Sequence, residues 1–318
     1  YDANGSFDAT SGNVTFSGSG TLELGGTVTS LGTFTPGTST VSYDGSSAQD
    51  IDDFGSKSGP YNNLDLDGGA EKDLTGNTTV NGVLSWSADV DMETNGHTLT
   101  IKQSPTGYDN NRVITGGSSS TVSVAYSSSS TNECFVPVGI DGSVRDISIT
   151  AASASAETYT VVYTPGSPGT INWNTTPTGV PINSTIVGSN TSATAHVNNH
   201  YYYDISRSGS VNATLKLKFA GLTEPGNNDK HVMHWNSGTS RWDQLASTGA
   251  TGYVTALATS FSPFGQGSGG GALPIDLVSF NGECEDNKVN ISFTVASQQN
   301  NDYFSIYRSQ NTTEWSLS

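Results

Sequence analysis

The chain is poor in basic residues. It has only 12 Lys and Arg against 29 Asp and Glu, so its formal net charge at pH 7 is −17. Nucleic-acid binding depends on clustered Lys and Arg side chains that displace the counterions of the phosphate backbone. The sequence therefore argues against nucleic acid as a partner, and anionic membrane surfaces are disfavoured for the same reason.

Long apolar segments are missing, and cysteine is scarce. No run reaches the ~18 apolar residues of a membrane-spanning helix, so we expect no membrane insertion. The two cysteines, Cys134 and Cys284, lie 150 positions apart, and we expect free thiols, with a disulfide between them as the alternative. Because the chain starts at Tyr1 instead of Met, we expect a processed or partial chain, for which a removed signal peptide is a natural explanation.

What the chain does have is glycine, small polar residues and regularly placed aromatics. Only 33% of it is hydrophobic and 13% charged, yet it contains 5 Trp, 13 Tyr and 11 Phe. Disordered chains combine low hydrophobicity with high charge and few aromatics, which is a different composition. The aromatic residues stand in short runs of alternating apolar and polar residues. The sequence therefore predicts a folded, all-β protein.

Residues 1–115 read as short strands separated by Gly, Asn, Asp and Ser turns. Residues 14–21 (VTFSGSGT) align with residues 41–48 (VSYDGSSA) at a spacing of 27. Short strands at a regular spacing predict a β-solenoid, in which coils stack because no single coil can bury its own apolar face. A sandwich with long hairpins is the competing interpretation.

Residues 116–264 contain longer and more aromatic strands with clean period-two alternation, which predicts an antiparallel β-sandwich. Residues 265–272 are rich in Gly and predict a flexible linker. This segment also matches the G-x-G-x-x-G pattern of dinucleotide-binding folds. That pattern binds a pyrophosphate only between a strand and a helix, and no helix is predicted after it.

Residues 273–318 carry the most specific pattern of the chain. Three strands and the start of a fourth follow one another in residues 273–280 (LPIDLVSF), 289–293 (VNISF), 301–309 (NDYFSIYRS) and 314–315 (EW). This order resembles an immunoglobulin- or fibronectin-like module of secreted Bacteroidota proteins, found just before the signal for type IX secretion. The resemblance implies an exported surface protein and no catalytic activity. About 100 residues make a complete module, so we expect an incomplete domain here.

Carboxylates provide the first candidate site. On a strand, Asp89, Asp91 and Glu93 would project from one face at intervals of ~6.6–7 Å. Carboxylate oxygens are the ligands that calcium prefers, so these residues are the predicted metal site, and no other cofactor is expected. The alternative is a solvated face whose like charges discourage pairing with other strands.

Two tryptophans provide the second candidate site. Trp235 and Trp242 flank a short polar turn, which predicts a hairpin with a cross-strand aromatic pair. The alternative is a platform on which sugar rings stack, so surface glycans are a possible partner.

These observations predict a non-enzymatic, secreted structural protein that self-assembles into a surface fibre, filament or sheath, with strand donation between subunits as one route. An adhesin or carbohydrate-binding surface module is the alternative. A polysaccharide-degrading solenoid enzyme, which would use a pair of acidic residues, is the third interpretation.

Overall fold

The computed structural model describes residues 1–55, 59–116, 119–166, 196–197, 201–219, 231–237, 241–250, 252–268, 277–285, 288–295, 307–308 and 316–317. Within these residues every regular element is a β-strand, which confirms the all-β prediction. The same part of the chain holds no helix that is long and apolar enough to cross a membrane. The chain divides into two compact units. One comprises residues 1–187 and 194–269, and the other comprises 188–193 and 270–318.

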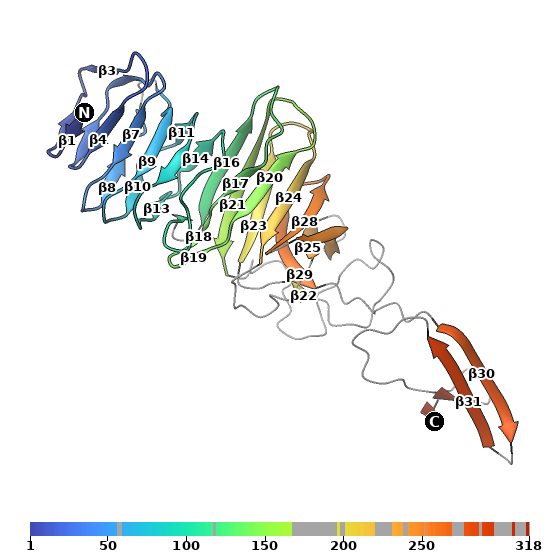
Figure 1. Cartoon of the computed structure of the whole chain (residues 1–318). Helices are drawn as coiled ribbons and strands as arrows, with labels where there is room; N and C mark the ends of the chain where they lie inside the picture. Colours follow the sequence, from blue (N-terminus) through green and yellow to red (C-terminus); the bar gives the residue numbers. More distant parts are fainter. Residues whose placement is uncertain are drawn as a thin grey trace. The chain divides into compact units, whose positions relative to one another are not determined.

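The N-terminal part of the first unit is a β-solenoid of parallel strands, as predicted, with three strand positions in each coil (Figure 1). The first position holds β1 (Asp2–Ala3), β4 (Thr21–Leu24), β7 (Thr40–Tyr43), β9 (Asn63–Leu66) and β12 (Leu84–Trp86). The second position holds β2 (Phe7–Asp8), β5 (Val28–Ser30), β8 (Gln49–Ile51), β10 (Lys72–Leu74), β13 (Met92–Glu93) and β15 (Ile114–Thr115). The third position holds β3 (Asn13–Thr15), β6 (Thr33–Thr35), β11 (Thr78–Val80), β14 (Thr98–Ile101) and β16 (Ser120–Tyr126).

Alternation along each strand explains why the coils stack. In β9, Leu64 and Leu66 are fully buried, whereas Asp65 between them is only partly buried. The parallel register places Leu64 opposite Leu84, so like residues lie above one another inside the solenoid. Each coil thus buries its apolar side chains only when a neighbouring coil covers them.

The spacing of the coils differs from the predicted repeat. Thr21 of β4 lies opposite Thr40 of β7, and Thr40 in turn lies opposite Asn63 of β9, so successive coils are unequal in length and both are shorter than predicted. The predicted repeat was wrong, because it matched Val14 in β3 with Val41 in β7, which occupy different positions in the coil. Both segments end in a Gly- and Ser-rich turn, and turn composition does not distinguish the corners of a coil.

Strand β16 joins the solenoid to the rest of the unit. It pairs in parallel with β14 on one edge and antiparallel with β21 (Glu157–Pro165) on the other. One antiparallel sheet continues through β23 (Tyr201–Arg207), β29 (Pro263–Ser268), β25 (His231–Asn236) and β26 (Arg241–Gln244), and β22 (His196–Val197) also pairs with β29. The second sheet contains β17 (Cys134–Val136), β20 (Ile147–Ala151), β24 (Ala213–Lys218), β28 (Tyr253–Ala258) and β27 (Ser247–Ala250). The short hairpin of β18 (Gly139–Ile140) and β19 (Ser143–Val144) stands apart from both.

Aromatic side chains fill this sandwich-like region, as its sequence predicts. Tyr163, Tyr201 and Tyr203 are buried with ring centroids 5.8 to 5.9 Å apart. The Tyr203 hydroxyl donates to the backbone carbonyl of Arg145, at 2.6 Å. The core thus satisfies a buried polar atom while it joins segments that are distant in the sequence.

The first four residues of the predicted linker form part of a strand instead. Residues 265–268 belong to β29, and Gly265 and Gly267 lie opposite Met233 and His231 in the sheet. Phe264 and Gln266 alternate with these glycines and are buried, so they anchor the segment as a strand despite its composition. Residues 269–272, the remainder of the predicted linker, lie outside the described residues.

The second unit contains a long hairpin of β30 (Leu277–Glu285) and β31 (Lys288–Val295), and a short pair of β32 (Tyr307–Arg308) and β33 (Ser316–Leu317). The hairpin is amphipathic. Phe280 lies opposite Phe293, whereas Asn281 lies opposite Ser292. Directly opposed residues share a face of the ribbon, so one face is apolar and the other polar. The immunoglobulin-like character of this unit stays a prediction.

Candidate functional site

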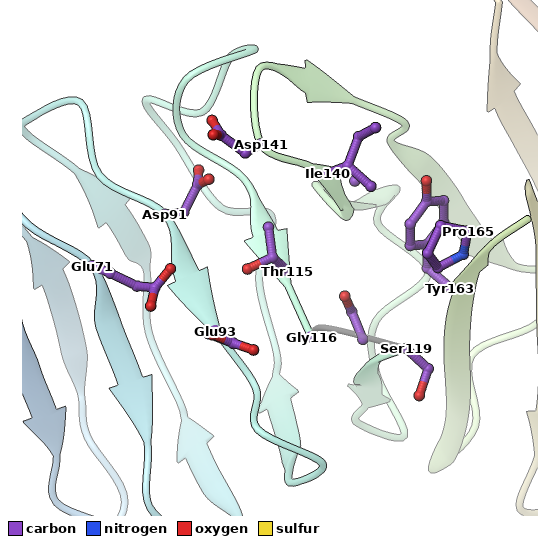
Figure 2. Close-up of a pocket in the computed structure, with 12 residues that line it drawn as sticks. Glu71, Asp91, Glu93, Thr115, Gly116, Ser119, Ile140, Asp141, Tyr163 and Pro165 are labelled. Atoms are coloured by element: carbon purple, nitrogen blue, oxygen red, sulfur yellow. The ribbon is translucent and has the colours of Figure 1, made fainter.

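A pocket of about 320 Å³ lies where the solenoid meets the β18–β19 hairpin and β21 (Figure 2). Four carboxylates lie along it, and hydroxyl groups and a small apolar wall complete it. The lining residues are Glu71, Asp91, Glu93, Thr115, Gly116, Ser119, Ser120, Gly139, Ile140, Asp141, Tyr163 and Pro165.

Asp141 lies in the turn of the β18–β19 hairpin, whereas the other carboxylates come from the outer surface of the solenoid. In one row on that surface, Asp73 of β10 lies opposite Asp50 of β8 and Glu93 of β13. Side-chain oxygens of Glu71, Asp73 and Glu93 lie within 4.8 Å of one another. Figure 2 shows the side chain of Glu71 extending toward the neighbouring strand that carries Glu93. The parallel stacking of coils thus gathers acidic residues from successive coils of the chain.

This crowding alters the acidity of the site. Partial burial, followed by the charges of Asp73, Glu93 and Asp91, raises the pKa of Glu71. Burial also raises the pKa of Asp73, although a hydrogen bond from Asn95 acts in the opposite direction. For Asp91, burial raises the pKa against the effect of a backbone hydrogen bond from Val113. Glu71, Asp73 and Asp91 therefore hold their protons more tightly than isolated carboxylates, and a bound cation would relieve the repulsion between the negative charges.

The structure divides the predicted calcium residues. Glu93 and Asp91 line the pocket, but Asp89 forms an ion pair with Arg112, 2.6 Å from its guanidinium. The predicted set also missed Glu71 and Asp73. They lie one coil earlier, and only the coil spacing, which the sequence comparison misjudged, would have placed them next to Glu93. Calcium at these carboxylates stays a prediction, with Asp89 placed outside the group.

The remaining walls of the pocket limit what it can bind. Ile140 is 43% exposed and, with Tyr163 and Pro165, forms the less polar side of the pocket, away from Glu71 and Glu93 (Figure 2). Thr115 and Ser119, which carry hydroxyl groups, also line the pocket (Figure 2). Acceptor oxygens facing a small apolar surface suit a cationic group with a hydrocarbon part, or the hydroxyl groups of a sugar.

The two tryptophans form the cross-strand pair of a hairpin, as predicted. Trp235 of β25 lies directly opposite Trp242 of β26, with ring centroids 5.7 Å apart and planes at 64°. Trp242 is completely buried and Trp235 is half-buried. A sugar ring needs an exposed aromatic face, so a stacking platform made of both rings is not available here. Only Trp235 keeps a partly exposed surface.

The first cysteine is a free thiol. Cys134 in β17 is buried, and this burial raises the pKa of its thiol to about 12. Such a thiol is protonated at neutral pH and unreactive, because the thiolate is the nucleophilic form. Cys134 therefore has the character of a core side chain.

Comparisons with protein-family models, with curated proteins and with solved structures found no match. The function must therefore be inferred from the geometry of the chain itself.

Proposed function

We propose that the protein is a non-enzymatic, extracellular structural subunit that assembles end to end into a surface fibre, filament or sheath. The observation that supports this proposal most directly is the first coil of the solenoid. Its strands β1, β2 and β3 each pair with the second coil on one edge and with no other strand among the described residues. Exposed strand edges of this kind are templates for pairing with another chain.

The side chains of the first coil support the same inference. Ala3 lies opposite Leu24, Phe7 opposite Val28, and Val14 opposite Phe34. The three second-coil residues are buried, whereas Ala3, Phe7 and Val14 are only partly buried. The first described coil thus has an incompletely covered apolar layer, which a further layer of strands would cover.

The β30–β31 ribbon offers a second surface for assembly. On its apolar face Phe280 is 56% exposed, Val289 61% and Ile291 38%. An isolated two-stranded ribbon is marginally stable in water, and large exposed apolar patches mark interaction sites. We infer that a neighbouring subunit covers this face. Contact between two different surfaces of successive subunits produces an open polymer when the rotation between subunits does not close a ring.

Electron microscopy of the purified chain tests the proposal. We expect regular filaments from the wild type and dispersed particles from Val14→Lys, because a charge placed in the partly buried end layer opposes its covering. Thr15→Lys is the matched control, since Thr15 is exposed in the same strand and its variant should still form filaments. Dispersed wild-type particles over a wide concentration range would refute assembly.

A parallel pair of variants tests the ribbon. Ile291→Lys places a charge on the apolar face, and Ser292→Lys places the same charge on the polar face. We expect only the first to shorten or abolish filaments. If both variants polymerise like the wild type, the ribbon takes no part in assembly and the solenoid end alone carries it.

An adhesin is the second candidate, and the acidic pocket favours it. Its carboxylates and hydroxyls suit a sugar or a cationic group, although no ligand is assigned by the geometry. Glycan-array binding that is lost in Glu93→Gln and kept in Trp235→Ala would place recognition in the pocket. The reverse result would place it at the half-buried tryptophan.

A further inference from the structure

A lysine and a glutamine face each other inside the solenoid. Gln49 of β8 and Lys72 of β10 are directly opposed in the parallel register, and both side chains point inward. Lys72 is 0% exposed and Gln49 is 5% exposed. The next two residues in the same inward row, Met92 and Ile114, are apolar. An ammonium group here is removed from water, which is energetically costly unless the group is paired.

No carboxylate in the described part of the chain forms an ion pair with Lys72. Its Nζ instead donates to Gln49 Oε1 at 2.9 Å and to the carbonyl of Gly45 at 3.0 Å. Burial of a lysine against a neutral carboxamide leaves its charge without a carboxylate in direct contact, although the charges of Asp44 and Asp67 act on it from beyond ion-pair distance. A reaction that removed this charge would therefore stabilise the folded coil.

The carboxamide of Gln49 is held in a fixed position. Its Oε1 also accepts the backbone N–H of Gly45 at 2.8 Å, and its Nε2 donates to the carbonyls of Leu24 and Gly26 at 2.6 and 2.8 Å. Gly45 is required for this fit, because a Cβ at that position would lie 2.6 Å from Gln49 Cδ. The Gly45 N–H is placed to stabilise negative charge on Oε1, as donors of an oxyanion hole do.

The amine lies within reach of the carboxamide carbon. Nζ is 2.9 Å from Oε1, and a carbonyl bond measures about 1.23 Å, so Cδ lies at most about 4.1 Å from Nζ. Attack distances of ~3–3.5 Å, held in place, give very large effective concentrations of the reacting groups. A small rotation of either side chain brings the two atoms into this range.

Asp44 supplies a group that can move protons. It precedes Gly45, its charge acts on Lys72, and its Oδ1 is buried without a hydrogen-bond partner. A buried carboxylate oxygen with no partner is unusual in a folded protein and indicates a role beyond packing. Because its charge acts on the Lys72 amine, it is a candidate to accept a proton from Nζ and to return one to the leaving amide nitrogen.

We propose that Lys72 and Gln49 form an intramolecular isopeptide bond. Nζ attacks Cδ, the Nζ–Cδ bond forms, and the Cδ–Nε2 bond breaks. Counted from the ammonium form of Lys72, Nζ gives up two protons, one of them by way of Asp44. Both leave with Nε2 as an ammonium ion, so atoms and charge balance without any oxidant, reductant or co-reactant.

The bond would join β8 to β10 covalently and so tie two successive coils together. Coils of a solenoid otherwise hold to each other only through neighbour contacts. A cross-link at this position resists separation of the coils under load. The reaction is independent of the proposed assembly, because it takes place within one chain whether or not filaments form.

Mass spectrometry of the denatured full chain tests the proposal. We expect the intact mass to be lower than the sequence mass by one ammonia. Trypsin should fail to cut after Lys72, and the peptide of residues 1–57 should remain attached to that of residues 58–102. A mass equal to the sequence mass, with normal cleavage after Lys72, would overturn the proposal, and the pair would then be a hydrogen-bonded network only.

Variants assign the roles. Lys72→Arg and Gln49→Met should each restore the sequence mass, while Lys102→Arg, at an exposed lysine, should keep the loss of ammonia. Asp44→Asn leaves both reacting groups in place and should slow bond formation at least tenfold, measured as the unlinked fraction over time after refolding. Because the wild-type mass decides the matter alone, a variant that fails to fold leaves the proposal testable. Retention of the mass loss in Lys72→Arg would assign it to other residues and refute the bond.

Discussion

The solenoid and the sandwich-like region share β16, yet the residues that contact each other in their cores are separated by different lengths of chain. In the solenoid, Leu64 is covered by Leu84, which lies one coil further along the chain. In the sandwich-like region, the Tyr203 hydroxyl binds the carbonyl of Arg145, a residue that lies several strands earlier. The first core is a stack of neighbours, in which each coil contacts only the coils beside it. The second closes only when distant segments meet, so we expect it to unfold as one unit.

Removal of Trp242 should give the largest effect. Trp242→Ala deletes a completely buried indole, and we expect a loss of about 3–5 kcal/mol in unfolding free energy, measured by urea denaturation. Trp235→Ala is the matched control. Because the Trp235 side chain is only half-buried, its removal should lower the unfolding free energy clearly less. Equal losses would mean that the pair acts through its mutual contact and not through burial.

A cavity in the solenoid should act more locally. Leu64→Ala removes a buried side chain between β7 and β12, at a cost of about 2–5 kcal/mol to that stack. We expect faster amide hydrogen exchange in β7, β9 and β12, with little change in β23 and β24. Uniform acceleration in both regions would show that β16 couples them into one cooperative unit.

The stability of the sandwich-like region depends in part on the negative charge of Glu157. It is 2% exposed, and its carboxylate accepts hydrogen bonds from the Ser208 hydroxyl and the Val211 N–H, at 2.7 and 3.0 Å. A Cβ at Gly209 would lie 2.7 Å from its Oε2, so this turn between β23 and β24 is fitted to the carboxylate. Burial by itself would raise the pKa of Glu157, but these hydrogen bonds together lower it.

Glu157→Gln should therefore destabilise the region by about 1.5–3 kcal/mol at neutral pH, the range for hydrogen bonds to charged groups. A lowered folded-state pKa contributes stability above the unfolded pKa of about 4.3, and this stability is lost as the pH falls through the folded value. Urea unfolding at several pH values should show this acid loss in the wild type and not in the variant. An unchanged pH profile would mean that Glu157 contributes by shape alone.

The sequence predicted the strands better than their arrangement. Alternation around Leu64 and Leu66, or along Tyr201 to Tyr203, reflects burial on one face, which is a local property. The coils differ in length because turns of different lengths close them, as the unequal steps between β4, β7 and β9 show. Similar turns at different corners therefore gave a false repeat. In β29, the two glycines led to the prediction of a linker. The structure has a strand there instead, because Phe264 and Gln266 are buried beside these glycines.

The candidate sites were only partly predictable for the same reason. Asp91 and Glu93 were found because they are neighbours in one segment, whereas Glu71 and Asp73 required the correct coil register. Nothing in the sequence predicts the contact between Gln49 and Lys72. Neither residue is part of a recognisable motif, and their contact depends on the coil register. Asp89 and Asp91 stand two positions apart and cannot be distinguished by sequence. Asp89 lies outside the group because it forms an ion pair with Arg112.

The clustered carboxylates of the solenoid should respond to pH in the sense opposite to Glu157, with the smallest effect. Because the folded-state pKa values of Glu71, Asp73 and Asp91 are raised, their ionisation opposes folding at neutral pH, and stability recovers as the pH falls toward the unfolded values near 4. Glu71→Gln should raise the stability of the solenoid at pH 7 by about 0.2–1 kcal/mol, the range for cross-strand charge pairs, and toward its lower end because Glu71 is exposed. Glu23→Gln, an exposed carboxylate on β4 outside the group, should change nothing. Loss of stability in Glu71→Gln would instead mean that the carboxylates hold a cation, and calcium should then raise the Tm of the wild type but not of the variant.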